Sequence, residues 1–262
     1  MGGTRRLGIA LGAGAARGWA HIGVLERLAE MGVHPDVVAG CSSGAFVGAF
    51  LAADRMAALR DTAAEMSWLR TFRMLDWNIR DGGLIQGSQV GELLDRKLGV
   101  GSIEGLKRPF GCSTTELTTG RERWLMRGDL GPAVRASMAV PGFMAPQKVD
   151  GMRLVDGALT NPVPVSLAKA LGADVVIAVA LGGEMSLNLA PEDDDPCAGQ
   201  VAVDHLVQAL GAQPTIERET EAMSYFEVVS QAMIIVQNFV TRIHLASEPA
   251  DLLLIPHVRD VG

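Results

Sequence analysis

The amino-acid sequence predicts an α/β fold in which a mostly parallel sheet carries helices on both faces. The first fifty residues alternate between strand and helix patterns, in the ranges 7–11, 18–31, 37–39 and 44–53. This alternation is typical of parallel strands joined by crossover helices. A chain of 262 residues, 48% of them hydrophobic, can bury one large core and is marginal for two. We therefore expect one domain over residues 1–262, with its clearest buried strand at 173–181.

The remaining elements follow from periodicity and turn residues. Residues 55–105 are expected to be largely helical, with a glycine-rich break at "RDGGLIQG". Two strands, "PFGCSTTELTTG" and "RERWLM", precede a short helix over 133–138, and "MRLVD" is a strand inside a region rich in Pro and Gly that is otherwise loop. Beyond the core motifs in 7–181 we expect an acidic surface excursion over about 182–215, then a C-terminal helix and an edge strand within 217–258.

The net charge of −7 and a pI near 5.3 limit the classes of partner. Nucleic-acid binding is not expected, because neutralising phosphates requires clustered Lys and Arg. Three scattered cysteines provide neither a disulfide framework nor a metal knuckle, which favours a reducing cytoplasm. Two arginines before the first apolar segment leave a secretory leader as a minority alternative. The sequence has no run of about 18 apolar residues that would predict a membrane-spanning helix.

The stretch "VVAGCSSGAFVGAF" at 37–50 places three small polar side chains between an apolar strand and a helix. Gly40 to Gly44 match the pattern Gly-x-Ser-x-Gly, whose flanking glycines let a sharp turn close and expose the central side chain. Ser42 is therefore the candidate nucleophile, and Ser43 is expected to contribute its backbone N–H group to an oxyanion. The alternative is that these serines only cap the following helix.

A second motif, "LGAGAARG" at 11–18, follows the first strand. Such a glycine-rich turn can bind a dinucleotide, but that function requires an acidic residue at the end of the second strand. Asp36 precedes that strand instead. Because adjacent parallel strands would bring the loop beside Ser42, an oxyanion hole built from backbone N–H groups is the better interpretation.

A third motif, "RLVDGALTNPVP", places Asp156 at the end of a strand. An aspartate there is expected at the carboxyl edge of the sheet, where α/β active sites gather. Taken alone, Asp-Gly is a common turn dipeptide. Together with Ser42 and the glycine-rich loop, Asp156 is interpreted as a catalytic residue.

These three motifs, with "RASMAVPGFMAP", resemble those of the patatin-like phospholipases, which are lipid acyl hydrolases, and in particular their bacterial members. The resemblance extends from about Leu7 to Leu181. It implies a three-layer α/β/α fold and a catalytic Ser–Asp dyad without histidine, with Ser42 as nucleophile and Asp156 as base. The implied oxyanion hole and its supporting motif residues are Ala13, Gly14, Ala15 and Ser43, and Gly12, Arg17, Gly18, Gly40, Gly44 and Gly157.

The resemblance also implies a lipid or other acyl ester as substrate, with no metal or cofactor. The protein is expected in the cytoplasm, with peripheral contact at the inner membrane surface. Family members often have three or four consecutive glycines where this chain has Ala13 and Ala15. Because alanine disfavours positive φ, we expect φ below zero at both positions. Arg17 is expected to hold this loop, and His21 to pack under the first helix beside it.

Two other functions fit the sequence. A Ser-Asp-His triad would need His205, His244 or His257, none of which lies in a glycine-flanked loop. The second alternative is a non-enzymatic protein that binds acyl chains or a regulatory partner. A helical stripe between Trp68 and Ile79 is interpreted as ordinary core or, functionally, as a flap over 66–79 that touches a membrane.

Overall fold

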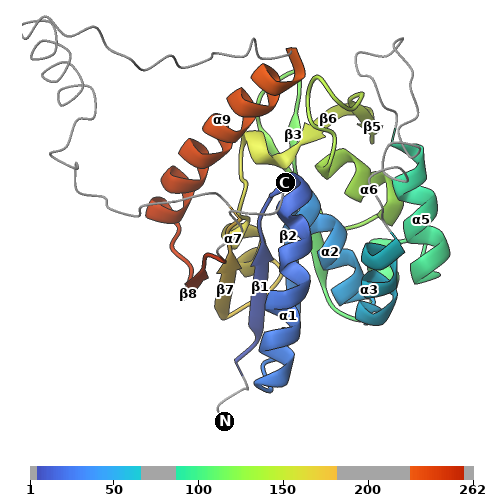
Figure 1. Cartoon of the computed structure of the whole chain (residues 1–262), viewed down its shortest axis with the longest axis vertical. Helices are drawn as coiled ribbons and strands as arrows, with labels where there is room; N and C mark the ends of the chain where they lie inside the picture. Colours follow the sequence, from blue (N-terminus) through green and yellow to red (C-terminus); the bar gives the residue numbers. More distant parts are fainter. Residues whose placement is uncertain (1–4, 66–86, 182–224, 257–262) are drawn as a thin grey trace, which may run out of the picture.

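The sheet at the centre of the molecule is mixed but mostly parallel (Figure 1). The computed structural model describes residues 5–65, 87–181 and 225–256. Its eight strands follow the order β5-β6-β3-β2-β1-β7-β8, with β4 paired to β3 outside this path. The strands are β1 (Leu7–Leu11), β2 (Val37–Cys41), β3 (Phe110–Glu116), β4 (Glu122–Leu125), β5 (Gln147–Val149), β6 (Met152–Asp156), β7 (Val175–Val179) and β8 (Leu252–Leu254).

Helices cover both faces of this sheet, which confirms the three-layer α/β fold (Figure 1). Alternate strand residues face opposite sides, so Ile9 and Leu11 enter one buried cluster and Ala10 the other. The smaller cluster packs against α7 (Val165–Ala170) and, through Leu245, the end of α9 (Tyr225–Ser247). The larger packs against α1 (Ala20–Glu30), α2 (Ser43–Ala52), α3 (Met56–Glu65), α5 (Ser88–Leu98) and α6 (Leu130–Ser137).

Strand β3 links two differently oriented halves of the sheet. Its first residues pair in parallel with β2, as far as Cys41 opposite Ser113. Its later residues pair antiparallel with β6, where Thr114 lies opposite Asp156. Asp156 therefore lies at the carboxyl end of β2, the edge of the sheet that the sequence suggested, but it comes from a strand that runs in the opposite direction.

The region before Asp156, expected to be loop around a single strand, contains a hairpin. Strand β5 pairs antiparallel with β6, and the turn between them holds Asp150 at φ 48° and Gly151 at φ 79°. Two successive positive φ values are those of a type I′ turn, which Asp-Gly favours. The expected flap at 66–79, the acidic excursion at 182–215 and residues 217–224 of the C-terminal helix lie outside the described residues. The single-domain assignment stays a prediction.

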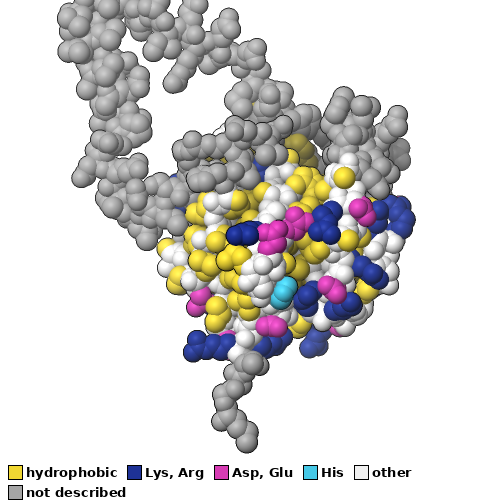
Figure 2. All heavy atoms as spheres, turned by 60° about the horizontal axis from the view of Figure 1, so that its bottom comes forward, with side chains coloured by type: hydrophobic (Ala, Val, Ile, Leu, Met, Phe, Trp, Pro, Cys, Tyr) yellow, Lys and Arg dark blue, Asp and Glu magenta, His cyan; other side chains and the backbone are white. Residues whose placement is uncertain are grey.

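Charged side chains of both signs are mixed on the surface. Figure 2 shows them across the centre, at the right and along the lower edge of that face, with the largest area of hydrophobic side chains at its left and centre between them. Exposed ion pairs such as Arg60–Glu26 (2.8 Å) and Lys107–Asp54 (2.9 Å) are of a kind that contributes little to stability. The fold therefore depends on its buried clusters. Within the described ranges, no helix is both long and apolar enough to cross a membrane.

Helix α2 packs directly against the end of β1, and Gly44 has the least room for a side chain of any glycine in the described residues. A Cβ atom added to Gly44 would lie 2.1 Å from the Leu11 carbonyl oxygen and 2.6 Å from that of Gly12. Gly40 is similarly restricted, since its added Cβ would lie 2.5 Å from the Cα of Ala45. Only glycine at these positions lets α2 start immediately beside β1 and β2.

We expect Gly44→Ala to destabilise the protein by about 1–3 kcal/mol or more, because the new methyl group meets backbone that cannot move independently. Gly23→Ala is the matched control: Gly23 lies inside α1 with nothing within 4 Å of an added Cβ, so alanine should stabilise by about 0.5–1 kcal/mol. Urea unfolding of both variants measures the difference. Equal stabilities would contradict the proposed role of this contact.

Candidate active site

Ser42 lies on a strained turn between β2 and α2. Its φ and ψ are 54° and −122°, and its side chain is nearly buried. A non-glycine residue rarely adopts this conformation, which persists only where surrounding packing enforces it. The Ser42 carbonyl accepts hydrogen bonds from the N–H groups of Ala45 and Phe46, so α2 starts directly at this residue. The turn thus holds the Ser42 hydroxyl at the positive end of a buried helix.

The loop after β1 approaches this turn closely enough to offer it backbone donors. Among residues 12–15, the N–H of Gly12 donates to the Val179 carbonyl at 2.9 Å, and that of Ala13 to the Pro162 carbonyl at 2.9 Å. Ala13 was expected to be an oxyanion donor, but its N–H group is already used. In the described part of the chain, the N–H groups of Gly14, Ala15 and Ser43 make no hydrogen bond.

The expectation of negative φ at Ala15 is wrong. Ala15 has φ 47° and begins the 3-10 helix η1 (Ala15–Trp19), whose Gly18 packs so tightly that an added Cβ would lie 2.3 Å from the Cβ of Ser43. A left-handed alanine costs roughly 1–2 kcal/mol. The reversal needed to bring η1 against the start of α2 imposes this conformation despite its cost.

His21 and Arg17 support the loop in different ways. His21 is fully buried in α1, and its Nε2 lies 2.8 Å from the Gly12 carbonyl oxygen. Burial lowers the His21 pKa to about 4, so the ring is neutral at pH 7 and donates its Nε2–H to that carbonyl. Arg17 acts through its backbone, whose N–H donates to the Gly14 carbonyl at 3.0 Å. Its guanidinium makes no hydrogen bond or ion pair with another described residue.

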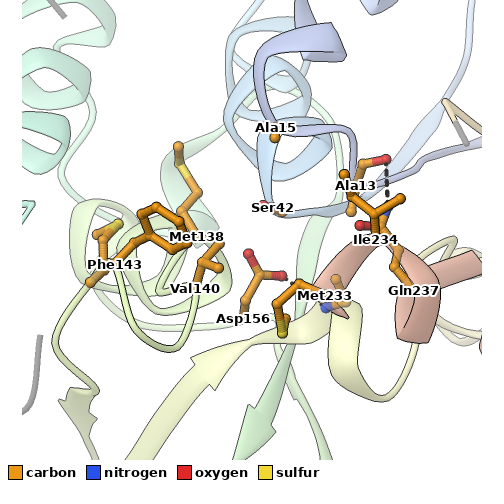
Figure 3. Close-up of a pocket in the computed structure, with 12 residues that line it drawn as sticks. Ala13, Ala15, Ser42, Met138, Val140, Phe143, Asp156, Met233, Ile234 and Gln237 are labelled. Carbon is orange, nitrogen blue, oxygen red and sulfur yellow. Dashed lines mark hydrogen bonds between the residues drawn. The ribbon is translucent and has the colours of Figure 1, made fainter. Parts of the chain in front are cut away.

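Asp156 is almost completely buried and points toward Ser42 (Figure 3). Its Oδ1 accepts a hydrogen bond from the Ala158 N–H at 2.8 Å, whereas its Oδ2 has no hydrogen-bond partner in the described part of the chain. The backbone is fixed on both sides: the Asp156 N–H donates to the Ala139 carbonyl at 2.9 Å, and the Thr115 hydroxyl donates to the Asp156 carbonyl at 2.9 Å. Gly157 lets this turn close against β3, since an added Cβ would lie 2.4 Å from the Ser113 carbonyl oxygen.

Burial raises the pKa of Asp156 to about 6. The Ala158 N–H and the nearby side chains of Ser42 and Cys41 oppose this shift by favouring the charged carboxylate. The raised value brings Asp156 close to the pKa that a general base needs near neutral pH. At pH 7 the carboxylate is mostly ionised, and its unpartnered Oδ2 can accept a proton.

An apolar pocket of about 320 Å³ opens beside both residues (Figure 3). Met138, Val140 and Phe143 line one side of it, from the segment that follows α6. Met233 and Ile234 line the other side from α9, whose Gln237 donates a side-chain hydrogen bond to the Ala13 carbonyl at 3.1 Å. The pocket therefore brings together Ser42, Asp156, Ala13 and Ala15 with an acyl-sized apolar space.

The histidine alternative gains no geometric support. His244 lies on α9 but does not line the pocket, and His205 and His257 are outside the described residues. The described ranges also hold no group of three or more His, Cys, Asp or Glu residues arranged to bind a metal ion.

Sequence reasoning missed the contribution of two segments. The sequence predicts a helix at the C-terminus but no part for it in the site, yet α9 supplies a wall of the pocket and Gln237. Polar residues within its otherwise apolar sequence, Gln237 among them, are a signal that could have indicated this role. Ser137, inside the quoted "RASM" motif, was given no role, although its hydroxyl accepts a hydrogen bond from the Ser42 N–H.

Comparisons with known proteins agree with this geometry. The model of the patatin-like phospholipase family matches residues 9–169. An uncharacterised NTE family protein of Mycobacterium tuberculosis is 38% identical over 178 residues, covering 68% of this chain and 49% of that protein. Patatin-like phospholipase domain-containing protein 6 of Homo sapiens is 34% identical over 195 residues, covering 72% of this chain and 14% of that protein. The chain thus spans about half the length of the mycobacterial relative and a small part of the human one.

Among solved structures, VipD from Legionella pneumophila superposes with a TM-score of 0.51 at 15% identity, covering 78% of this chain and 56% of VipD. At this identity the likeness concerns the fold alone. It agrees with the three-layer arrangement described above.

We expect Asp156→Asn to stabilise the protein at pH 8 and to have little effect at pH 4. The folded-state pKa of Asp156, about 6, lies above its unfolded value of 3.8, so its contribution to stability is present below pH 4 and is lost as pH rises through 6. The difference corresponds to roughly 3 kcal/mol. Asparagine keeps an oxygen for the Ala158 N–H but carries no charge.

Thermal unfolding of both proteins at pH 4 and pH 8 measures this effect. Asp54→Asn is the control, because the pKa of that exposed carboxyl is lowered by Lys107 and its removal should stabilise at neither pH. If Asp156→Asn is less stable than wild type at pH 8, burial of the charged Asp156 carboxylate does not destabilise the folded protein, and this prediction is wrong.

Proposed function

Because the chain belongs to the patatin-like phospholipase family, we propose that it is a serine acyl hydrolase that cleaves a lipid ester with the dyad Ser42–Asp156. The observation that carries this proposal is the buried Asp156 carboxylate, which points toward Ser42 in an apolar pocket and whose Oδ2 has no hydrogen-bond partner among the described residues. No metal or cofactor enters the proposed mechanism.

In the first half of the proposed reaction, Ser42 Oγ attacks the ester carbonyl carbon while its proton moves to Asp156 Oδ2. The tetrahedral oxyanion accepts hydrogen bonds from the N–H groups of Gly14, Ala15 and Ser43, which are unpaired within the described chain. Collapse breaks the ester C–O bond, and Asp156 returns the proton to the leaving alcohol. The product of this half is an acyl group on Ser42.

The second half repeats these roles with water. Asp156 Oδ2 takes a proton from a water molecule as its oxygen attacks the acyl carbon, and the same amides hold the second oxyanion. Collapse releases the carboxylic acid and returns the proton to Ser42 Oγ. Because the pKa of Asp156 is about 6, both halves slow as pH falls below that value.

The pocket supports an acyl chain of moderate length. An apolar cavity of about 150 Å³ accommodates one benzene molecule, so the space of about 320 Å³ beside Ser42 has room for roughly a dozen carbon atoms. Apart from Ser42, Asp156 and Gln237, whose side-chain nitrogen already donates to the Ala13 carbonyl, its walls are apolar side chains that offer no hydrogen bonds to a head group. The head group is therefore proposed to lie outside this part of the site.

We also propose that α9 contacts the surface of a neutral phospholipid bilayer. Ile235 and Phe239 are 60% and 65% exposed, and Val228 and Ile243 lie exposed on the same helix. The sequence of this helix has Glu227 and Arg242 as its only Asp, Glu, Lys or Arg residues, so this contact would be hydrophobic and nearly independent of lipid charge. Because α9 also lines the acyl pocket, a lipid would pass between bilayer and pocket along one apolar helix.

Cys41 and Cys112 form no disulfide, which agrees with the proposal that the protein acts on the cytoplasmic side of that membrane, where thiols stay reduced.

We expect Ser42→Ala, Asp156→Ala and the double variant to share one low rate of ester hydrolysis, because residues that act as a unit are not additive. Ser43→Ala should be mild, since it keeps the amide. Initial rates with p-nitrophenyl esters of increasing chain length measure this, with labelling of Ser42 by a fluorophosphonate as a second readout.

His244→Ala is the matched control and should keep most activity, whereas loss of a triad histidine costs on the order of 10⁴-fold. An inactive His244→Ala beside a fully active Asp156→Ala would exclude the dyad. A wild-type protein that neither hydrolyses esters nor reacts with the fluorophosphonate would favour the acyl-binding alternative.

For the membrane contact, the wild-type protein should sediment with phosphatidylcholine vesicles, and the double variant Ile235→Ser/Phe239→Ser should stay in the supernatant. Met31→Ser is the control: Met31 is 62% exposed at the end of α1, away from α9 in the chain, and should not affect sedimentation. Raising the salt concentration should change binding little. Wild-type protein found entirely in the supernatant would end this proposal.

A further inference from the structure

The motif "RASMAVPGF" supplies a wall of the acyl pocket, but its Ser137 has no role in the proposed reaction, although it makes two buried hydrogen bonds at the centre of the site. Ser137 is the last residue of α6 and is fully buried. The Ser42 N–H donates to its Oγ at 2.9 Å, and its hydroxyl donates to the Ser113 carbonyl at 2.7 Å. One side chain thus joins the nucleophile's backbone to strand β3.

This hydroxyl occupies the place of a missing sheet hydrogen bond. The Val38 N–H donates to the Pro109 carbonyl at 2.9 Å, and bonds of a parallel pair recur at every second residue. The same series would join the Ser42 N–H directly to the Ser113 carbonyl. The positive φ of Ser42 turns the chain away from β3 there, and the Ser137 hydroxyl bridges the gap that results.

The residues that follow Ser137 hold the other parts of the site. The Ala139 carbonyl accepts the hydrogen bond from the Asp156 N–H at 2.9 Å. Met138 and Val140 line the apolar pocket. Residues 137–140 therefore contact the nucleophile's backbone, the base's backbone and the acyl space within four consecutive positions.

We propose that Ser137 is a positioning residue that fixes the distance between Ser42 and Asp156. The inference rests on the proposed function of that pair. Without the Ser137 hydroxyl, the Ser42 N–H and the Ser113 carbonyl lose a shared buried partner, and the strained turn can relax away from β3. A displacement near 1 Å at a reacting group can cost about 10²-fold in rate. The pocket walls stay in place, so substrate binding is retained.

The test compares Ser137→Ala, Ser137→Thr and wild type in p-nitrophenyl ester hydrolysis. Ser137→Ala should lower kcat about 10- to 100-fold with KM nearly unchanged, and Ser137→Thr, which keeps the hydroxyl, should recover a large part of the loss. Thr62→Ala is the matched control, because Thr62 is a buried helical residue of α3 whose hydroxyl donates to the Ala58 carbonyl at 2.7 Å. It should lose comparable thermal stability and keep its kcat.

Hydrogen exchange of the Ser42 amide gives a readout that needs no activity. That amide should be protected in wild type and Thr62→Ala, and should exchange much faster in Ser137→Ala. A Ser137→Ala variant with the kcat of Thr62→Ala, or with a protected Ser42 amide, would overturn the inference. A wild-type protein without esterase activity but with an amide protected by Ser137 would instead refute the proposed function, while the bridging contact would stand.

Discussion

The contact between the first turn of α2 and the end of β1 is the constraint on which the site depends. Gly44 has no side chain to collide with the Leu11 carbonyl, and Gly18 has none to collide with Ser43. Three backbone segments therefore meet with almost no side chains between them. This arrangement brings Ser42 and Ala15 to the same pocket, and the Ala15 amide makes no hydrogen bond with another described residue. The positive φ values of Ser42 and Ala15 are consequences of that meeting, maintained by packing on every side.

The second determinant is the change of direction in the sheet at β3. Because β3 extends beyond β2, an antiparallel strand can pair with its free end and bring Asp156 level with Cys41. A parallel strand in the same place would begin beside Cys41, so its last residue would lie away from the end of β2. The antiparallel pairing also buries Asp156 beneath the pocket, where desolvation raises its pKa. Topology and acid–base behaviour thus have one structural origin.

Sequence reasoning recovered the fold class, and it placed Ser42 on a turn between a strand and a helix and Asp156 at the end of a strand, where the structure has them. These features rest on local signals: strand periodicity, a Gly-x-Ser-x-Gly turn and an aspartate at a strand end. The catalytic roles of both residues stay predictions. It did not recover features set by partners distant in the chain. The Ala13 N–H donates a hydrogen bond to the Pro162 carbonyl and is therefore not available to an oxyanion. Ala15 adopts a positive φ because η1 packs against α2. Likewise, the Ser137 hydroxyl gains its role only from the gap between Ser42 and Ser113, which no local pattern records.

The absence of a charged partner beside Asp156 sets how this base responds to its substrate. Among the described residues, the influences on its pKa are burial, one backbone N–H and two neutral side chains, with no cation. In the proposed mechanism, an acyl chain in the pocket would keep water away from this buried carboxylate and so maintain its raised pKa. A carboxylate with a higher pKa is a stronger base, so the proposed proton transfer from Ser42 would be easier than a transfer to an exposed aspartate. Burial without a cation would thereby give Asp156 a basicity that an ion-paired aspartate would not have.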